Sequence, residues 1–170
     1  QYDITKDEKQ SSIQLRFDEE NFCHLLGIES IVKYSVSKND IHNYKGQDGW
    51  DFIQETGLCF NDLKRMNKSK FKSIKAKFVY FYLMPDIIEH PVAVNFENKN
   101  VDPPTKIDCD ILFYTRNENA IVHLGIKEDE TLGYYIPKTF FVEKIGEDGA
   151  DIYIDKQKQI IATKKNRVIM

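Results

Sequence analysis

The hydrophobic pattern changes its period part-way along the chain, and this change constrains the fold more than any other feature. Between Phe17 and Pro85 the apolar residues recur at helical spacing. From Lys106 onward they alternate with polar residues, as in the segment KIDCDILF, which is typical of half-buried strands. Helices followed by strands predict an α+β fold, in which N-terminal helices pack on one face of a four- or five-stranded antiparallel meander sheet.

Local signals divide the helical part into three segments. In FDEENFCHLLGI, Asp18 is expected to cap a short helix that ends at Gly27. A second helix is predicted from Trp50 to Glu55, and a third region starts at Asn61 or Asp62 and ends near the next proline.

Turn signals divide the second half into strands. The proline-rich stretch 89–105 predicts a crossover loop or an irregular sheet edge. Beyond it, turns at 117–119, 127–133 and 146–149 separate the predicted strands. Those strands are KIDCDILF, AIVHLGIK, GYYIPKTFFVEK and ADIYI, with a last strand in QIIAT.

The chain is predicted to form one domain. Its 170 residues, 41% of them hydrophobic, can build one core, and we expect a flexible segment at 1–16, a single domain at 17–163 and a tail at 164–170. No apolar run is long enough to span a bilayer. The three cysteines lie far apart and form no CxxC pair, which argues against a disulfide framework. We therefore expect a cytoplasmic protein with no membrane partner.

Positive charge is concentrated in one segment. Seven Lys and Arg residues lie between Lys64 and Lys77 with no acidic residue among them, although the whole chain carries a net charge of −3. They either solvate an exposed helix face or bind a polyanion. The residues predicted to contact RNA are Lys64, Arg65, Lys68, Lys72 and Lys75.

One histidine points away from the apolar stripe of its predicted helix. At 100° per residue, Leu25 and Leu26 fall on either side of Phe22, whereas His24 falls about 200° away. His24 is therefore either solvated or placed at a seam with another element. At such a seam an imidazole suits proton transfer.

The strand pattern gathers a second set of polar residues. Alternation places Arg116, His123, Tyr135 and Thr139 on the same face, and Lys138 joins them only if Pro137 introduces a β-bulge. An ordinary half-exposed polar face is the alternative. The predicted catalytic residues are His24, His123, Thr139, Tyr135, Arg116 and Lys138.

Such a set suits metal-independent cleavage of RNA. A base removes the proton of the ribose 2′-hydroxyl, a cation stabilises the phosphorane, and an acid protonates the departing 5′-oxygen. Asp108 and Asp110 provide only two ligands for a metal ion, so we expect no metal and no cofactor. No Walker loop, GxGxxG, GxSxG or HExxH motif occurs.

Two strings resemble a known family. NFCHLLGI and YYIPKTFFVEK, separated by a D-x-D-I-L-F strand and an HLGI strand, resemble the fourth family of phage-encoded barnase, EndoU, colicin and RelE-like nucleases. The resemblance covers about residues 15 to 145. It implies N-terminal helices packed against a four-stranded antiparallel sheet whose exposed face carries the active site, in a ribonuclease-like toxin of a phage or mobile element. By this resemblance His24 and Thr139 match the motifs, and Pro137 and Phe140 shape their strand.

Two functions stay open at this stage. The first is a ribonuclease-like domain that acts on RNA and has an antitoxin or immunity protein as a partner. The alternative is a non-catalytic module on the same scaffold that binds nucleic acid or protein. The enzyme needs His24 or His123 within hydrogen-bond reach of Thr139, Tyr135 or a cation, whereas the binder needs only a continuous basic surface.

We predict that His24→Ala and Thr139→Ala each abolish RNA cleavage and leave the thermal midpoint nearly unchanged, because each removes a reacting group and not a core side chain. Cleavage of a labelled RNA and thermal unfolding, measured on the same preparations, check this. A variant that unfolds would assign its residue to the structure instead.

Overall fold

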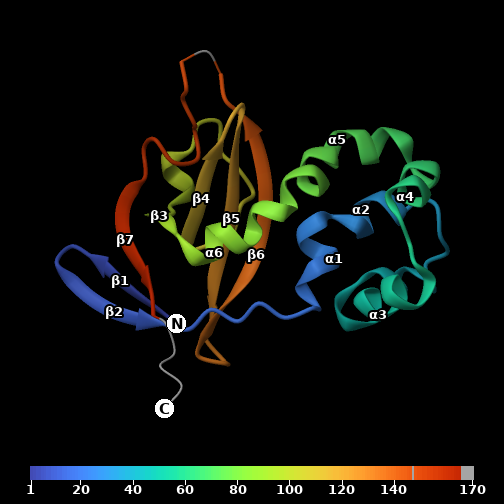
Figure 1. Ribbon diagram of the computed structural model, residues 1–170, viewed down its shortest axis with the longest axis horizontal. Coiled ribbons are helices and arrows are strands. Elements are labelled where there is room, and N and C mark those ends of the chain that lie inside the picture. Colours follow the sequence, from blue (N-terminus) through green and yellow to red (C-terminus); the bar gives the residue numbers. More distant parts are fainter. Residues whose placement is uncertain (147, 166–170) are drawn as a thin grey trace. The chain divides into compact units, whose positions relative to one another are not determined.

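A computed structural model describes residues 1–146 and 148–165, and confirms the α+β class (Figure 1). The chain forms two compact units. Residues 17–81 make up the helical unit, and residues 1–16 together with the chain from Tyr82 onward make up the sheet unit. The predicted tail at 164–170 begins with the last residue of a strand, and its positions 166–170 lie outside the described residues.

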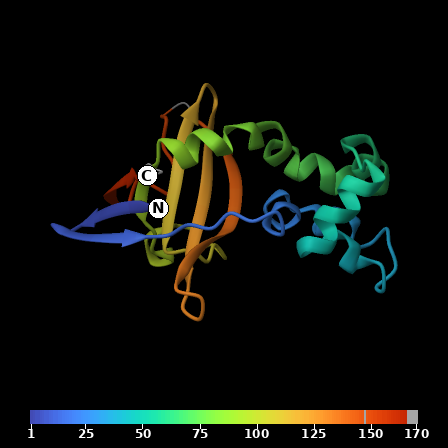
Figure 2. The same ribbon diagram turned by 60° about the horizontal axis from the view of Figure 1, so that its bottom comes forward.

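In its described residues the sheet unit contains seven strands, which follow one another across the sheet in the order β2-β1-β7-β3-β4-β5-β6, and every neighbouring pair is antiparallel. The strands are β1 (Tyr2–Lys6), β2 (Lys9–Ile13), β3 (Val92–Asn95), β4 (Ile111–Asn117), β5 (Ala120–Asp129), β6 (Tyr134–Lys144) and β7 (Lys158–Lys164). Figures 1 and 2 show β4, β5 and β6 side by side as the predicted meander.

Three strands lie where the sequence pattern predicts none. Residues 1–16, expected to be flexible, contain β1 and β2, because Tyr2 and Ile4 are buried at alternate positions and β7 pairs with the other side of β1. The proline-rich stretch contributes the short strand β3. Conversely, the predicted strand ADIYI forms turns, since the Asp151 carboxylate accepts a hydrogen bond from the Tyr153 amide at 2.8 Å.

One face of the sheet packs against α6 (Met84–Glu89). The Tyr2 ring lies 5.5 Å from that of Phe113, and the Tyr2 hydroxyl donates to the Ile88 carbonyl at 2.9 Å, which fixes the helix on this face. The opposite face of β4 and β5 is covered by the segments that flank β3 and β6, and its buried core includes Val94, Leu112, Ile121 and Ile154.

The helical unit has a separate hydrophobic core. Its helices are α1 (Asn21–Leu26), α2 (Ile28–Val32), α3 (Gly46–Thr56), α4 (Phe60–Met66) and α5 (Lys68–Tyr80). Short 3-10 turns lie at Ile41–Tyr44, at Phe81–Leu83 where the two units meet in the sequence, and at Asn98–Asn100 in the sheet unit.

Glycines end two helices as predicted, at Gly27 (φ 70°) and Gly57 (φ 66°). The first helix starts at Asn21, later than an Asp18 cap would place it. The predicted third region is two helices and not one. Asn67 divides it, because its side chain accepts a hydrogen bond from the Lys70 amide at 3.0 Å and so caps α5.

Among the described residues, no helix has both the length and the apolar character that a membrane crossing requires. All three cysteines are free thiols.

Gly125, in strand β5 of the meander, has no room for a side chain. A Cβ there would lie 2.6 Å from Thr139 Cγ2 and 2.9 Å from Cys109 Sγ. We predict that Gly125→Ala lowers the free energy of unfolding by about 1–3 kcal/mol through overpacking, as measured by urea denaturation. The double variant Gly125→Ala/Thr139→Ser lacks the nearest methyl group and should recover part of the loss. No recovery would mean that the Cys109 side chain, and not the Thr139 methyl group, sets the cost.

Candidate functional site

Residues that pair across antiparallel strands place their side chains on the same face of the sheet. The register of β4, β5 and β6 therefore defines one face by two adjacent rows, Tyr114–His123–Phe141 and Arg116–Ile121–Glu143. We call this the His123 face. This face carries the Arg116 cation, the His123 imidazole and the Glu143 carboxyl group in two adjacent rows.

His123 is fully buried on this face and pairs with Asp151. Its Nε2 lies 2.7 Å from Asp151 Oδ2, and both side chains are at most 1% exposed. The imidazole stacks on the Phe141 ring at a centroid distance of 4.3 Å, and the Tyr153 ring meets it edge-on at 5.9 Å. His123 lies on the face that the alternation predicts, but the exposed face that the resemblance implies is not exposed at His123. The turns at 151–156 cover it.

The charge state of Asp151 decides which of the two side chains donates this hydrogen bond. Burial raises the pKa of Asp151, but the hydrogen bond and charge of His123, the Tyr153 amide and the Arg116 charge together outweigh burial and lower it. Asp151 is therefore a carboxylate that accepts, and Nε2 of His123 donates. Within the described part of the chain, His123 Nδ1 is a buried nitrogen with no hydrogen-bond partner.

Two exposed groups flank the buried pair. Although Glu143 is exposed at the surface, partial burial of its carboxyl group is the largest effect and raises its pKa. The charge of His123 lowers this pKa and the charge of Asp151 raises it, and the net shift is upward. Arg116 donates from Nη1 to the Gly149 carbonyl at 3.0 Å, and its charge lowers the pKa of Asp151. Glu143 and Arg116 are exposed and are therefore the groups of this face that a bound molecule can contact.

A β-bulge decides where the predicted residues of β6 lie. Gly125 pairs with Thr139 but Ile126 pairs with Pro137, so the register skips Lys138 and Lys138 is the extra residue of a bulge. The bulge considered at Pro137 is thus present, and Thr139 lies on the His123 face as predicted.

The same bulge moves Tyr135 away from the set. Counted across the extra residue, Tyr135 pairs with Glu128 and lies on the face of Leu124 and Ile126. The prediction that Tyr135 shares a face with Thr139 is therefore wrong. Simple alternation fails because the period of two is interrupted at Lys138, which is itself exposed.

His24 belongs to the helical unit. It is exposed on α1, whereas Cys23, Leu25 and Leu26 are buried, which is the orientation that the 100° spacing predicts. Its role as an acid or base stays a prediction.

Four of the five predicted RNA contacts come together in the helical unit. Lys64 of α4 and Lys68, Lys72 and Lys75 of α5 line a groove of 430 Å³. We call it the lysine groove. Arg65 does not line it, and its guanidinium instead pairs with Asp62 at 2.9 Å.

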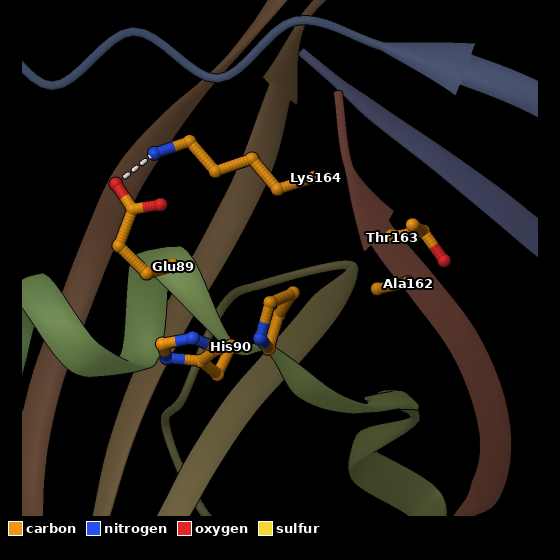
Figure 3. Close-up of a pocket in the computed structure, with 6 residues that line it drawn as sticks. Glu89, His90, Ala162, Thr163 and Lys164 are labelled. Atoms are coloured by element: carbon orange, nitrogen blue, oxygen red, sulfur yellow. Dashed lines mark hydrogen bonds and ion pairs between the residues drawn. The ribbon is translucent and has the colours of Figure 1, made fainter. Parts of the chain in front are cut away.

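Figure 3 shows a polar hollow of 320 Å³ between the end of α6 and β7. Glu89 and Lys164 form an ion pair there, and His90 Nδ1 lies 3.1 Å from Asp86 on the same helix. The charges around the hollow are therefore already paired.

The carboxylates considered for a metal ion are also engaged. Asp108 lies 2.6 Å from the Lys127 ammonium, and Asp110 accepts a hydrogen bond from the Glu128 amide at 2.9 Å. Among residues 1–146 and 148–165, no group of three or more His, Cys, Asp and Glu side chains is arranged to hold a metal ion.

Sequence reasoning missed Glu143 and Asp151. Glu143 has the parity of Phe141 and could have been found from the alternation alone. Asp151 carried no such signal, because its segment was interpreted as a strand and it meets His123 through a turn 28 residues further along the chain.

Together the fold and these groups define an α+β protein with acid–base side chains gathered on one sheet face. Residues 1–168 match the model of the family described as phage-Barnase-EndoU-ColicinE5/D-RelE like nuclease 4, and the chain belongs to this family. The resemblance of the two short strings is thereby confirmed, and nucleic acid is the substrate class that a nuclease family indicates. Comparison with curated proteins and with solved structures gives no match.

We predict that Asp151→Asn lowers the free energy of unfolding at pH 7 by about 1–3 kcal/mol, because it weakens a buried hydrogen bond to charge. The pKa of Asp151 is lowered on folding, so its contribution is present above the ordinary aspartate pKa of about 3.9 and is lost as the pH falls through the folded value.

Urea denaturation at pH 7 and pH 3 checks this, and the difference between the two should be smaller for Asp151→Asn than for the parent. Glu130→Gln, which removes a carboxylate from an exposed turn of the same unit, is the control and should leave both values unchanged. An equal pH dependence in Asp151→Asn and the parent would contradict the charged form of the pair.

Proposed function

We propose that this chain is a nuclease that cleaves RNA without a metal ion, at the His123 face of the sheet unit. The observation that carries the proposal is the placement of exposed Glu143 and Arg116 beside the buried His123–Asp151 pair. RNA supplies its own nucleophile, the 2′-hydroxyl, so the protein needs only acid–base and charge-stabilising groups.

Glu143 is the general base in this proposal. It takes the proton of the 2′-hydroxyl, whose oxygen attacks the adjacent phosphorus as the bond to the 5′-oxygen breaks. The products are a 2′,3′-cyclic phosphate and a 5′-hydroxyl, whose proton comes from solvent. A carboxyl group with a raised pKa is a better base near neutral pH than an ordinary one. Arg116 stabilises the negative charge that grows on the phosphorane.

His123 and Asp151 are positioning residues in this scheme. The imidazole is covered by Phe141 and Tyr153, and it contacts Asp151 directly. Through their charges the pair acts on the pKa of Glu143. The roles predicted for Thr139, Lys138, Tyr135 and His24 stay predictions, as does an antitoxin or immunity protein as a partner.

A binding module is the second candidate, and the lysine groove favours it. Its four lysines form a site for a polyanion whether or not the His123 face reacts. The two functions differ in one outcome, because the binder retains salt-sensitive affinity without any cleavage.

We predict that Glu143→Gln lowers the rate of RNA cleavage by about 10²- to 10⁴-fold, the usual cost of losing a general base. Cleavage is followed with a labelled single-stranded RNA, its DNA equivalent and its 2′-O-methyl equivalent, all in EDTA. Only the RNA should be cut, and it should leave a 2′,3′-cyclic phosphate. The rate should rise with pH as Glu143 loses its proton, above the ordinary glutamate pKa of about 4.3 because its pKa is raised.

Glu128→Gln is the matched control, since Glu128 is an exposed carboxylate on the opposite face of β5. It should cleave like the parent. Cleavage of DNA, or activity that EDTA removes and magnesium restores, would contradict the proposal. So would a Glu143→Gln variant as active as the parent.

A further inference from the structure

The lysine groove contains an aromatic ring that the packing of the helical unit leaves exposed. Phe60, the first residue of α4, is 57% exposed, although it is a large apolar side chain among ammonium groups. Its ring lies 5.1 Å from that of Phe78 in an edge-on arrangement and 6.5 Å from that of Phe71. Phe71 and Phe78 are buried and stack on each other at 5.5 Å. Two buried rings therefore hold one side of Phe60 in place.

The ammonium groups around this ring are available for an anion. Lys64, Lys68, Lys72 and Lys75 come from two consecutive helices and line the same 430 Å³ groove, whose lining contains no acidic residue. In the described part of the chain none of these four lysines takes part in an ion pair or a side-chain hydrogen bond. Arg65, next to Lys64, is instead paired with Asp62.

This combination fits one class of ligand. An exposed aromatic face surrounded by cations is the arrangement that holds single-stranded nucleic acid, because a base stacks on the ring while phosphates lie against the cations. A duplex does not offer a base in this way, because its bases stack on one another.

We propose that the lysine groove binds single-stranded RNA and that Phe60 is the platform on which one base stacks. The inference rests on the proposed function for its choice of RNA, and it adds that the helical unit selects unpaired segments. Its test measures binding and not cleavage, so its failure can be told from failure of the catalytic proposal.

The experiment uses the full chain carrying Glu143→Gln, so that any cleavage is suppressed, and a fluorescein-labelled uridine 12-mer in EDTA. Fluorescence anisotropy should show that Phe60→Ala weakens binding about 5- to 100-fold, the effect of losing one base stack. Phe60→Leu keeps apolar cover over Phe78 and should also weaken it. Binding of polyphosphate, which has charges but no bases, should be the same in both variants as in the parent.

Lysine variants separate charge from stacking. Lys68→Gln/Lys72→Gln should weaken the binding of both RNA and polyphosphate. It should also reduce the slope of log affinity against log salt by about 0.7 for each lysine. Tyr34→Ala is the matched aromatic control, because Tyr34 is 80% exposed beside Lys33 in the same unit but outside the groove. It should bind RNA like the parent.

A direct reporter completes the test. The chain has one tryptophan, so Phe60→Trp adds a second whose emission a stacked base should quench, whereas polyphosphate should not quench it.

Several results would overturn the proposal: unchanged RNA binding in Phe60→Ala and Phe60→Leu with native thermal midpoints, an equal effect of Phe60→Ala on duplex RNA, or no quenching. Phe60-dependent binding of poly-glutamate without RNA binding would also overturn it and indicate a protein partner. If Phe60-dependent RNA binding holds but the parent never cleaves, this inference stands and the catalytic proposal fails.

Discussion

One extra residue in β6 selects the side chains that can act together in the sheet unit. A strand alternates its side chains between two faces, and Lys138 interrupts that alternation opposite the Gly125–Ile126 step. Thr139 and Glu143 lie after the extra residue and share the face of His123 by regular alternation, whereas Tyr135 lies before it and is moved to the other face. Next to the bulge, the Thr139 methyl group lies over Gly125, where a Cβ would be only 2.6 Å from it. The extra residue therefore decides that Tyr135 is not part of the candidate site.

The sequence predicts the parts of this fold that depend on neighbouring residues. The change of period indicated the α+β class, Gly27 and Gly57 marked helix ends, and Pro137 pointed to the bulge. The sequence does not predict the parts of the fold that depend on contacts between residues far apart in the chain. The N-terminal hairpin is a case in point, since two buried residues in β1 are a weak signal until β7 is known to lie beside them. For the same reason Asp151 was missed, because its burial depends on a turn that meets a strand 28 residues away.

The His123–Asp151 pair is a costly arrangement for stability alone. Burying a carboxylate requires compensation, and a hydrogen-bonded buried pair is often no more stabilising than apolar residues of similar volume. Here the compensation is incomplete, because Nδ1 of His123 has no partner among the described residues. The pair also acts on the exposed carboxyl group beside it: burial raises the pKa of Glu143, the charge of His123 lowers it, and the smaller effect of the Asp151 charge raises it. An apolar replacement would remove both charges and leave the pKa of Glu143 to burial alone.

The lysine-rich segment also divides into two parts that the sequence alone could not separate. Lys77 is used inside the helical unit, where its ammonium donates to the Leu25 carbonyl at 3.2 Å and burial lowers its pKa. The lysines of the groove lie on another side of the same helices, around the exposed ring of Phe60. A helix face that is only solvated needs no aromatic ring among its lysines, whereas a site that holds an unpaired base does need one. The exposed ring of Phe60 is therefore the feature of this face that supports the proposed binding of RNA over a solvated helix face.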